Sequence, residues 1–207
     1  MQQLDLAREG VYLKPSSTLD KAASGWKRWH VPLACGDRTL AEAVATARLY
    51  GVEQRDVPLI IKLVENPDFI SSRLFHGAVS LQNHDCIHVL LGRGLLPKDE
   101  AFAIGFTMGS AKRLYAYEEK LYALIARYLY PIAYRFSTDD LSVFHTAVRL
   151  GMVSQCRPLN TIHYEFLMDH SLGEARRILG IEEDLLAACY RIEKARFPDS
   201  PESQRLI

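Results

Sequence analysis

Four residues that can bind a metal ion lie close together in the sequence. His84, Asp85 and His88 fall within five consecutive positions, and Glu100 follows His88 by twelve positions. In a helix that turns by about 100° per residue, the first three side chains share one face. The two histidines have the i, i+4 spacing at which two imidazoles reach one ion. This pattern predicts a metal site, and the competing interpretation is an ordinary helix surface followed by a turn.

The chain must reverse between His88 and Glu100 for these side chains to meet. Glycines and a proline interrupt the helical pattern over residues 92–97, and a short connection favours an antiparallel neighbouring helix. We therefore expect one helix over residues 68–91 and a second over residues 97–131. Glu100 lies in the first turn of the second helix, where the helix dipole favours an acid even without a metal.

Residue types alone do not select the metal. Two imidazoles with one or two carboxylates suit zinc, with open positions left for water or a substrate. Iron(II) and manganese accept the same donors. The sequence therefore indicates a divalent metal, with zinc as the first candidate.

Helical signals continue through the rest of the chain, and no alternating run of apolar and polar residues predicts a strand. Thr39 and Glu42 form a capping box, Ser137 with Asp140 starts a later helix, and Asn160 can cap the next. The further helices are expected over residues 39–51, 58–66, 137–154, 160–180 and 182–196.

These elements define the expected fold class. Residues 1–36 form an irregular N-terminal arm that proline, serine and glycine interrupt, and residues 198–207 form a polar tail that is expected to fray. Between them lies an all-α bundle of six or seven helices. The whole of residues 1–207 is expected to be a single domain.

Composition excludes several functional classes. The formal net charge of the 207 residues is zero, so no basic field exists to attract nucleic acid. The four cysteines are far apart and form neither a disulfide framework nor a thiolate zinc site. No signal peptide is recognisable, and no apolar run approaches the ~20 residues of a transmembrane helix. We expect a cytoplasmic protein without a membrane span.

The metal-binding pattern resembles the motif of the ubiquinone (coenzyme Q) biosynthesis protein four family. His84-Asp85-x-x-His88, eleven intervening residues and Glu100 match that motif. The similarity continues in a C-terminal stretch, through Leu159, Asn160, Tyr164, Glu165, Leu172, Arg176, Leu179, Gly180 and Ile181. It covers about residues 74–181, and the chain looks like a distant member.

The resemblance implies a ligand set and a reaction. All four motif residues would bind the metal. His163, Tyr164 and Glu165 would lie next to these ligands, in the second layer of side chains around the ion. Members of the family act in ubiquinone assembly, where they are linked to replacing the ring carboxylate of a polyprenylated precursor by a hydroxyl. The chain would then be a metal-dependent oxidative decarboxylase of a prenylated hydroxybenzoate. It would work with other enzymes of the pathway at the periphery of the inner membrane.

A polyprenyl substrate needs an apolar slot, and the helix over residues 97–131 offers candidates. Gly105 and Gly109 would let another backbone or a lipid tail approach closely. Tyr117 and Tyr128 belong to an apolar stripe along the same helix. Because a helix that is apolar on more than one flank is usually buried, we expect core at these positions rather than a lipid groove.

Two other functions remain open. The same domain could bind an isoprenoid or act as a scaffold without catalysis, either alone or as a homodimer. The pair His84-Asp85 also occurs in HD-type metal phosphohydrolases, which need an earlier histidine and a later aspartate. His30 and His76 are poorly placed to be the earlier histidine ligand. The later aspartate ligand could be Asp139 or Asp140.

Overall fold

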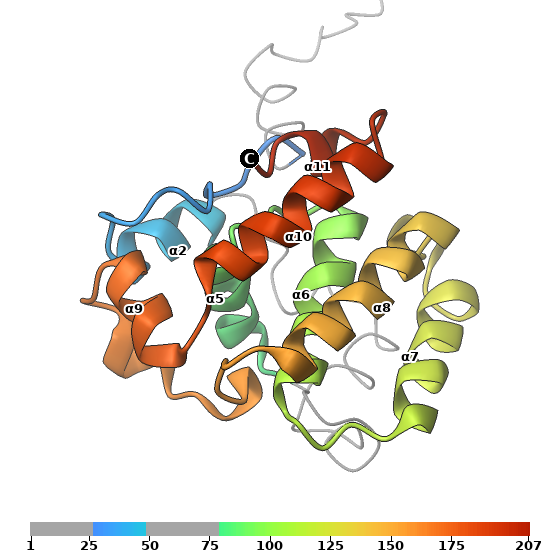
Figure 1. Cartoon of the computed structure of the whole chain (residues 1–207), viewed down its shortest axis with the longest axis horizontal. Coiled ribbons are helices and arrows are strands. Elements are labelled where there is room, and N and C mark those ends of the chain that lie inside the picture. The colour runs from blue at the N-terminus through green and yellow to red at the C-terminus, as the bar shows by residue number, and fades with distance from the viewer. Residues whose placement is uncertain (1–26, 49–78) are drawn as a thin grey trace, which may run out of the picture.

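The computed structural model describes residues 27–48 and 79–207, and these ranges contain eight α-helices and no strand (Figure 1). The helices are α2 (Leu40–Arg48), α5 (Leu81–Leu91), α6 (Pro97–Ser110), α7 (Ala116–Tyr128), α8 (Thr138–Val153), α9 (Leu172–Leu179), α10 (Glu183–Arg196) and α11 (Pro201–Gln204). The prediction of an all-α single domain is confirmed. None of these helices has the length and apolar character needed to cross a bilayer.

The N-terminal part of the described chain packs onto the body of the fold. Residues 27–38 contain no helix, and the indole of Trp29 donates a hydrogen bond of 3.1 Å to the Thr46 hydroxyl on α2. The capping box at Thr39 and Glu42 forms through two hydrogen bonds of 3.1 and 3.2 Å. The predicted helix over residues 58–66 lies outside the described residues.

The helix expected over residues 68–91 does not run unbroken. Residues 79 and 80 are not helical, and Ser80 caps α5 by accepting a hydrogen bond from the Asn83 backbone N–H. The predicted end of the helix is confirmed, because Gly92 adopts a left-handed φ of 67° directly after Leu91. Glycine tolerates this conformation better than any other residue.

Helices α6 and α8 form a close pair at the centre of the fold (Figure 1). A Cβ atom on Gly105 would collide with the Phe144 carbonyl oxygen of α8, and one on Gly109 would collide with the Val148 carbonyl oxygen. Gly151 of α8 meets the backbone of α6 in the same way. The close approach that the two α6 glycines predict is therefore made by another backbone, and α8 fills the space proposed for a lipid tail.

The single helix expected over residues 97–131 is wrong, because the chain leaves the helix after Ser110 and starts α7 at Ala116. Lys112 adopts a left-handed φ of 60° at this break. Its ammonium group donates to the carbonyl oxygens of Gly151 and Ser154 at 2.6 Å each, where α8 ends. These bonds satisfy carbonyl groups that a helix end leaves unpaired, and they favour the break.

Two C-terminal predictions are also wrong. Residues 160–180 do not form one helix: two short 3-10 helices precede α9, which Ser171 caps. The tail over residues 198–207 does not fray, because it contains α11 and the Leu206 side chain is only 1% exposed. The predicted helices over residues 137–154 and 182–196 are confirmed as α8 and α10.

The α6–α8 contact yields a stability prediction. Gly109→Ala should lower the free energy of unfolding by about 1–3 kcal/mol, because the added methyl group overlaps the α8 backbone. Gly173→Ala in α9 is the matched control, since its Cβ would make an ordinary contact at 3.6 Å with the Gly36 carbonyl oxygen. Urea unfolding measures both. Equal stability of the two variants would contradict the backbone contact.

Candidate metal centre

Two histidines of α5 and one glutamate of α6 converge on a single point. His84 Nε2 lies 2.8 Å from Glu100 Oε2 and 2.9 Å from His88 Nε2, and His88 Nε2 lies 3.3 Å from Glu100 Oε2. Within the described chain, these three residues form a group whose potential ligand atoms all lie within 4.8 Å of one another. The spacing in the sequence predicted this convergence.

Hydrogen bonds alone cannot satisfy this triangle of atoms. A neutral imidazole nitrogen carries either a proton or a lone pair. Burial raises the pKa of the Glu100 carboxyl, but the imidazoles of His88 and His84 outweigh it and hold that pKa well below its usual range, so the group is ionised. Whichever of the two nitrogens carries a proton, at least one of the three contacts has either two protons or no proton between its atoms, so it cannot be a hydrogen bond. A shared cation removes the conflict because it accepts a lone pair from each atom.

The geometry suits a divalent ion. Ligand atoms about 2.0–2.2 Å from one ion lie roughly 3.0–3.5 Å from one another, close to the distances observed here. The His88 side chain is fully buried, whereas those of His84 and Glu100 are 17% and 31% exposed. An ion held by these residues would be shielded on the His88 side and accessible on the other, which leaves positions for water or a substrate.

The C-terminal end of α5 is fixed by side chains from distant parts of the chain. The guanidinium of Arg176 donates to the carbonyl oxygens of Leu90 at 2.9 Å and of Leu33 at 2.7 Å. The Tyr190 hydroxyl donates to the Leu91 carbonyl oxygen at 2.6 Å. These bonds satisfy free carbonyl groups at the helix end, and the positive charge complements the helix dipole. The Arg176 of the C-terminal sequence stretch thus holds the helix that carries both histidines.

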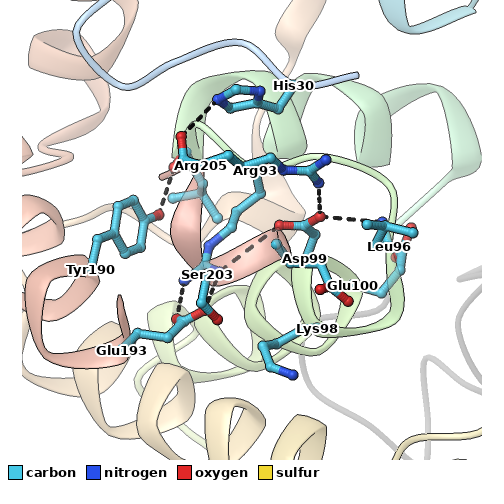
Figure 2. Close-up of polar contacts among 12 residues, drawn as sticks. His30, Arg93, Leu96, Lys98, Asp99, Glu100, Tyr190, Glu193, Ser203 and Arg205 are labelled. Carbon is cyan, nitrogen blue, oxygen red and sulfur yellow. Dashed lines mark hydrogen bonds and ion pairs between the residues drawn. The ribbon is translucent and has the colours of Figure 1, made fainter. Parts of the chain in front are cut away.

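The first turn of α6 is fixed by Asp99, the residue before Glu100. The Asp99 carboxylate accepts a hydrogen bond of 3.2 Å from the Leu96 backbone N–H, and it pairs with Arg205 (Figure 2). Its side chain is fully buried. Burial raises the pKa of the Asp99 carboxyl, and the nearby charges of Arg205 and Arg93 oppose this increase. The sequence did not predict that Asp99 fixes this turn. Its one local signal is that Asp99 directly precedes Glu100.

The structure does not bring every predicted site residue to the ligand group. Asp85 is half-buried on α5 and is not among the three converging residues, so its role as a ligand stays a prediction. His163 and Glu165 are exposed and contact each other at 3.1 Å. Tyr164 is buried and donates to the Leu159 carbonyl oxygen. The hydrogen bonds of these last three residues do not reach the ligands.

The apolar stripe on α7 is not core. Tyr117 and Tyr128 are 59% and 65% exposed, and Leu124 between them is 54% exposed. The expectation of burial is wrong for this stripe, because α7 turns its other face, with Tyr122 and Ala126, toward α8 and the core.

The residues considered for a phosphohydrolase site have other partners. His30 bonds through Nε2 to the Arg205 carbonyl oxygen at 3.0 Å. Asp140 pairs with Lys98 at 3.3 Å and caps α8. Neither residue joins the ligand group, and His76 lies outside the described residues.

Comparison of the chain with protein-family models, curated proteins and solved structures finds no match in any of the three. The fold and the site define a helical protein with a candidate metal centre of two histidines and one glutamate. The resemblance to the ubiquinone-biosynthesis family stays a prediction.

Metal analysis tests the centre directly. Protein prepared without a polyhistidine tag should carry close to one equivalent of divalent metal by elemental mass spectrometry. The variant His84→Ala, His88→Ala should carry none, because it lacks two of the three ligands. His145→Ala is the control, since His145 lies on α8 and pairs with Glu119. Metal retained in the double variant, or absent from the parent after zinc, iron(II) and manganese are offered, would contradict the site.

Proposed function

We propose that this chain is a metal-binding protein in which His84, His88 and Glu100 hold a divalent ion, with zinc as the first candidate and iron(II) or manganese as alternatives. The observation that carries the proposal is the triangle of ligand atoms, whose short contacts conflict as hydrogen bonds but agree as coordination. The sequence motif adds Asp85 to the proposed ligands.

We further propose that the centre binds the ring of a prenylated hydroxybenzoate in ubiquinone synthesis and supports its C1 decarboxylation and hydroxylation. The motif spacing supports this substrate class, and the partly exposed His84 and Glu100 leave space beside the ion. A bound divalent metal would act as a Lewis acid toward a carboxylate or phenolate. Zinc has no redox chemistry, so with zinc the two-electron oxidant would be oxygen: the hydroxybenzoate, oxygen and water would give the hydroxylated ring, carbon dioxide and hydrogen peroxide.

Activity separates this proposal from a non-catalytic isoprenoid-binding or scaffold role. Metal-loaded protein supplied with a prenylated 4-hydroxybenzoate and oxygen should release carbon dioxide and form the ring-hydroxylated product, detected by mass spectrometry. Glu100→Gln should abolish turnover, because it removes a charged ligand. Stoichiometric binding of the lipid without product in the parent protein, with each candidate metal, would favour the non-catalytic role.

The exposed face of α7 favours a lipid environment. We define the α7 apolar face as the exposed apolar side chains of α7 and of the residues that flank it, each at least 37% exposed: Tyr115, Tyr117, Leu121, Leu124, Tyr128, Leu129 and Ile132. The α7 acids turn away from solvent: Glu118 is buried, and Glu119 pairs with His145. Three basic side chains are exposed in the same segment, those of Arg113, Lys120 and Arg135.

Aromatic and aliphatic side chains beside basic ones suit the surface of an anionic bilayer. We propose that the protein contacts the membrane here, where its substrate and other pathway enzymes would be found.

Vesicle sedimentation tests the membrane contact. The protein should bind vesicles that contain anionic phospholipid more tightly than vesicles of phosphatidylcholine alone. Leu124→Ser with Tyr128→Ser should weaken this binding by roughly tenfold or more, because both side chains lose their transfer into the bilayer. Ile192→Ser is the control, since Ile192 is 69% exposed on α10, outside the α7 apolar face. An equal loss in both variants would contradict the assignment.

A further inference from the structure

A buried ion cluster includes Asp99 of the first turn of α6 and side chains from α10 and the C-terminal segment (Figure 2). We define the cluster as Arg93, Asp99, Glu193 and Arg205, which are two cations and two anions. The side chains of the first three are at most 5% exposed, and that of Arg205 is 14% exposed. The cluster joins the α5–α6 connection to α10 and to the C-terminal segment (residues 201–207).

One half of the cluster ties α10 to the α5–α6 connection. The guanidinium of Arg93 donates to both oxygens of Glu193, at 2.9 and 2.6 Å, and lies over the rings of Phe102 and Tyr190 at 3.8 and 4.3 Å. The Ser203 hydroxyl donates to the same carboxylate at 3.0 Å. Arg93 therefore directs its hydrogen bonds to Glu193, and its interaction with Asp99 is a longer ion pair of 3.9 Å.

Arg205 makes the other half of the cluster. Its guanidinium donates to the Asp99 carboxylate and, through the other terminal nitrogen, to the Lys27 carbonyl oxygen at 2.7 Å. A Cβ atom on Gly94 would overlap this guanidinium, so only glycine leaves room for it. Arg93 lies 3.9 Å from Asp99, beyond hydrogen-bonding distance. Of the two arginines, Arg205 is therefore the one that donates a hydrogen bond to Asp99.

Glu100 follows Asp99 directly in the first turn of α6. Among the residues that the structure describes, the Glu100 carboxylate contacts the two histidines, and no third side chain there holds it in place. Its location is set by the backbone of the first turn, which the Asp99 side chain fastens through the Leu96 N–H. A shift of this turn would move one ligand on α6 relative to two ligands on α5.

We propose that Arg205 is a positioning residue for the metal centre: by holding Asp99, it fixes the first turn of α6 and sets the affinity and coordination geometry at Glu100. This inference rests on the metal-binding function proposed above. Arginine suits the role because its planar group serves Asp99 and the Lys27 carbonyl at the same time, whereas the single ammonium of lysine cannot reproduce that geometry.

Cobalt(II) titration tests the proposal, since the absorption spectrum reports coordination geometry as well as affinity. Arg205→Met keeps the length of the side chain and removes its hydrogen bonds. It should raise the Kd for cobalt(II) by about 10–100-fold, as the loss of a residue that orients metal ligands typically does, and should change the spectrum of the bound ion. Arg205→Lys should restore part of the affinity.

Gln204→Ala is the matched control. The Gln204 amide donates to the carbonyl oxygens of Lys194 and Phe197, at 2.8 and 3.1 Å, so it anchors the same segment without touching Asp99. Its Kd should stay within about threefold of the parent value. If Gln204→Ala weakens binding as much as Arg205→Met does, or if Arg205→Met binds cobalt(II) like the parent, the positioning role is overturned.

Two further outcomes are distinguishable. If the parent protein binds no cobalt(II) or zinc, the proposed function fails before any variant is compared. If Arg205→Met does not fold, the paired variant Asp99→Asn, Arg205→Gln replaces it, because that pair leaves no unpaired buried charge. Weaker binding by the paired variant supports the role of Arg205, and parent-like affinity overturns it.

Discussion

The constraint on which this structure depends is the contact between the last turns of α5 and the first turn of α6. Three ligand atoms from these two helices must lie within 3.3 Å of one another. The connection between them is short, and Gly92 reverses the chain in a left-handed conformation. Distant side chains then fix each helix end: Arg176 and Tyr190 hold the carbonyl groups of α5, and Arg205 holds Asp99 at the start of α6.

The side chains that fix this contact are expensive to bury. Arg93, Asp99 and Arg176 are each at most 1% exposed, and a buried ion pair is often no more stabilising than apolar residues of similar size. Apolar packing would hold the helices together but tolerates small shifts between them. Directional hydrogen bonds from a planar guanidinium define one arrangement, which is what a site assembled from two helices requires.

Local signals in the sequence predicted the centre of the site but not its surroundings. The i, i+4 histidines and the break at Gly92 are local features, so His84, His88 and Glu100 could be expected to converge. The non-helical residues 79–80 before α5 and 111–115 after α6 contain no glycine or proline, so no local signal marks these breaks. The break after α6 depends on hydrogen bonds from Lys112 to the distant end of α8.

Contacts between residues far apart in the chain could not be predicted in this way. Arg205 and Asp99 are 106 positions apart, and nothing near Arg205 in the sequence indicates that the tail is packed. The apolar stripe of α7 predicted core because hydrophobic periodicity does not distinguish a face that meets another helix from one that meets solvent or lipid.

We propose that one divalent ion binds to His84, His88 and Glu100. A crystal structure of zinc-loaded protein, with diffraction data collected on both sides of the zinc absorption edge, tests it most directly. We expect one anomalous peak about 2.0–2.2 Å from Nε2 of each histidine and from the Glu100 carboxylate. A peak at other residues only, or no peak despite excess zinc, would show that these three residues do not form the metal site.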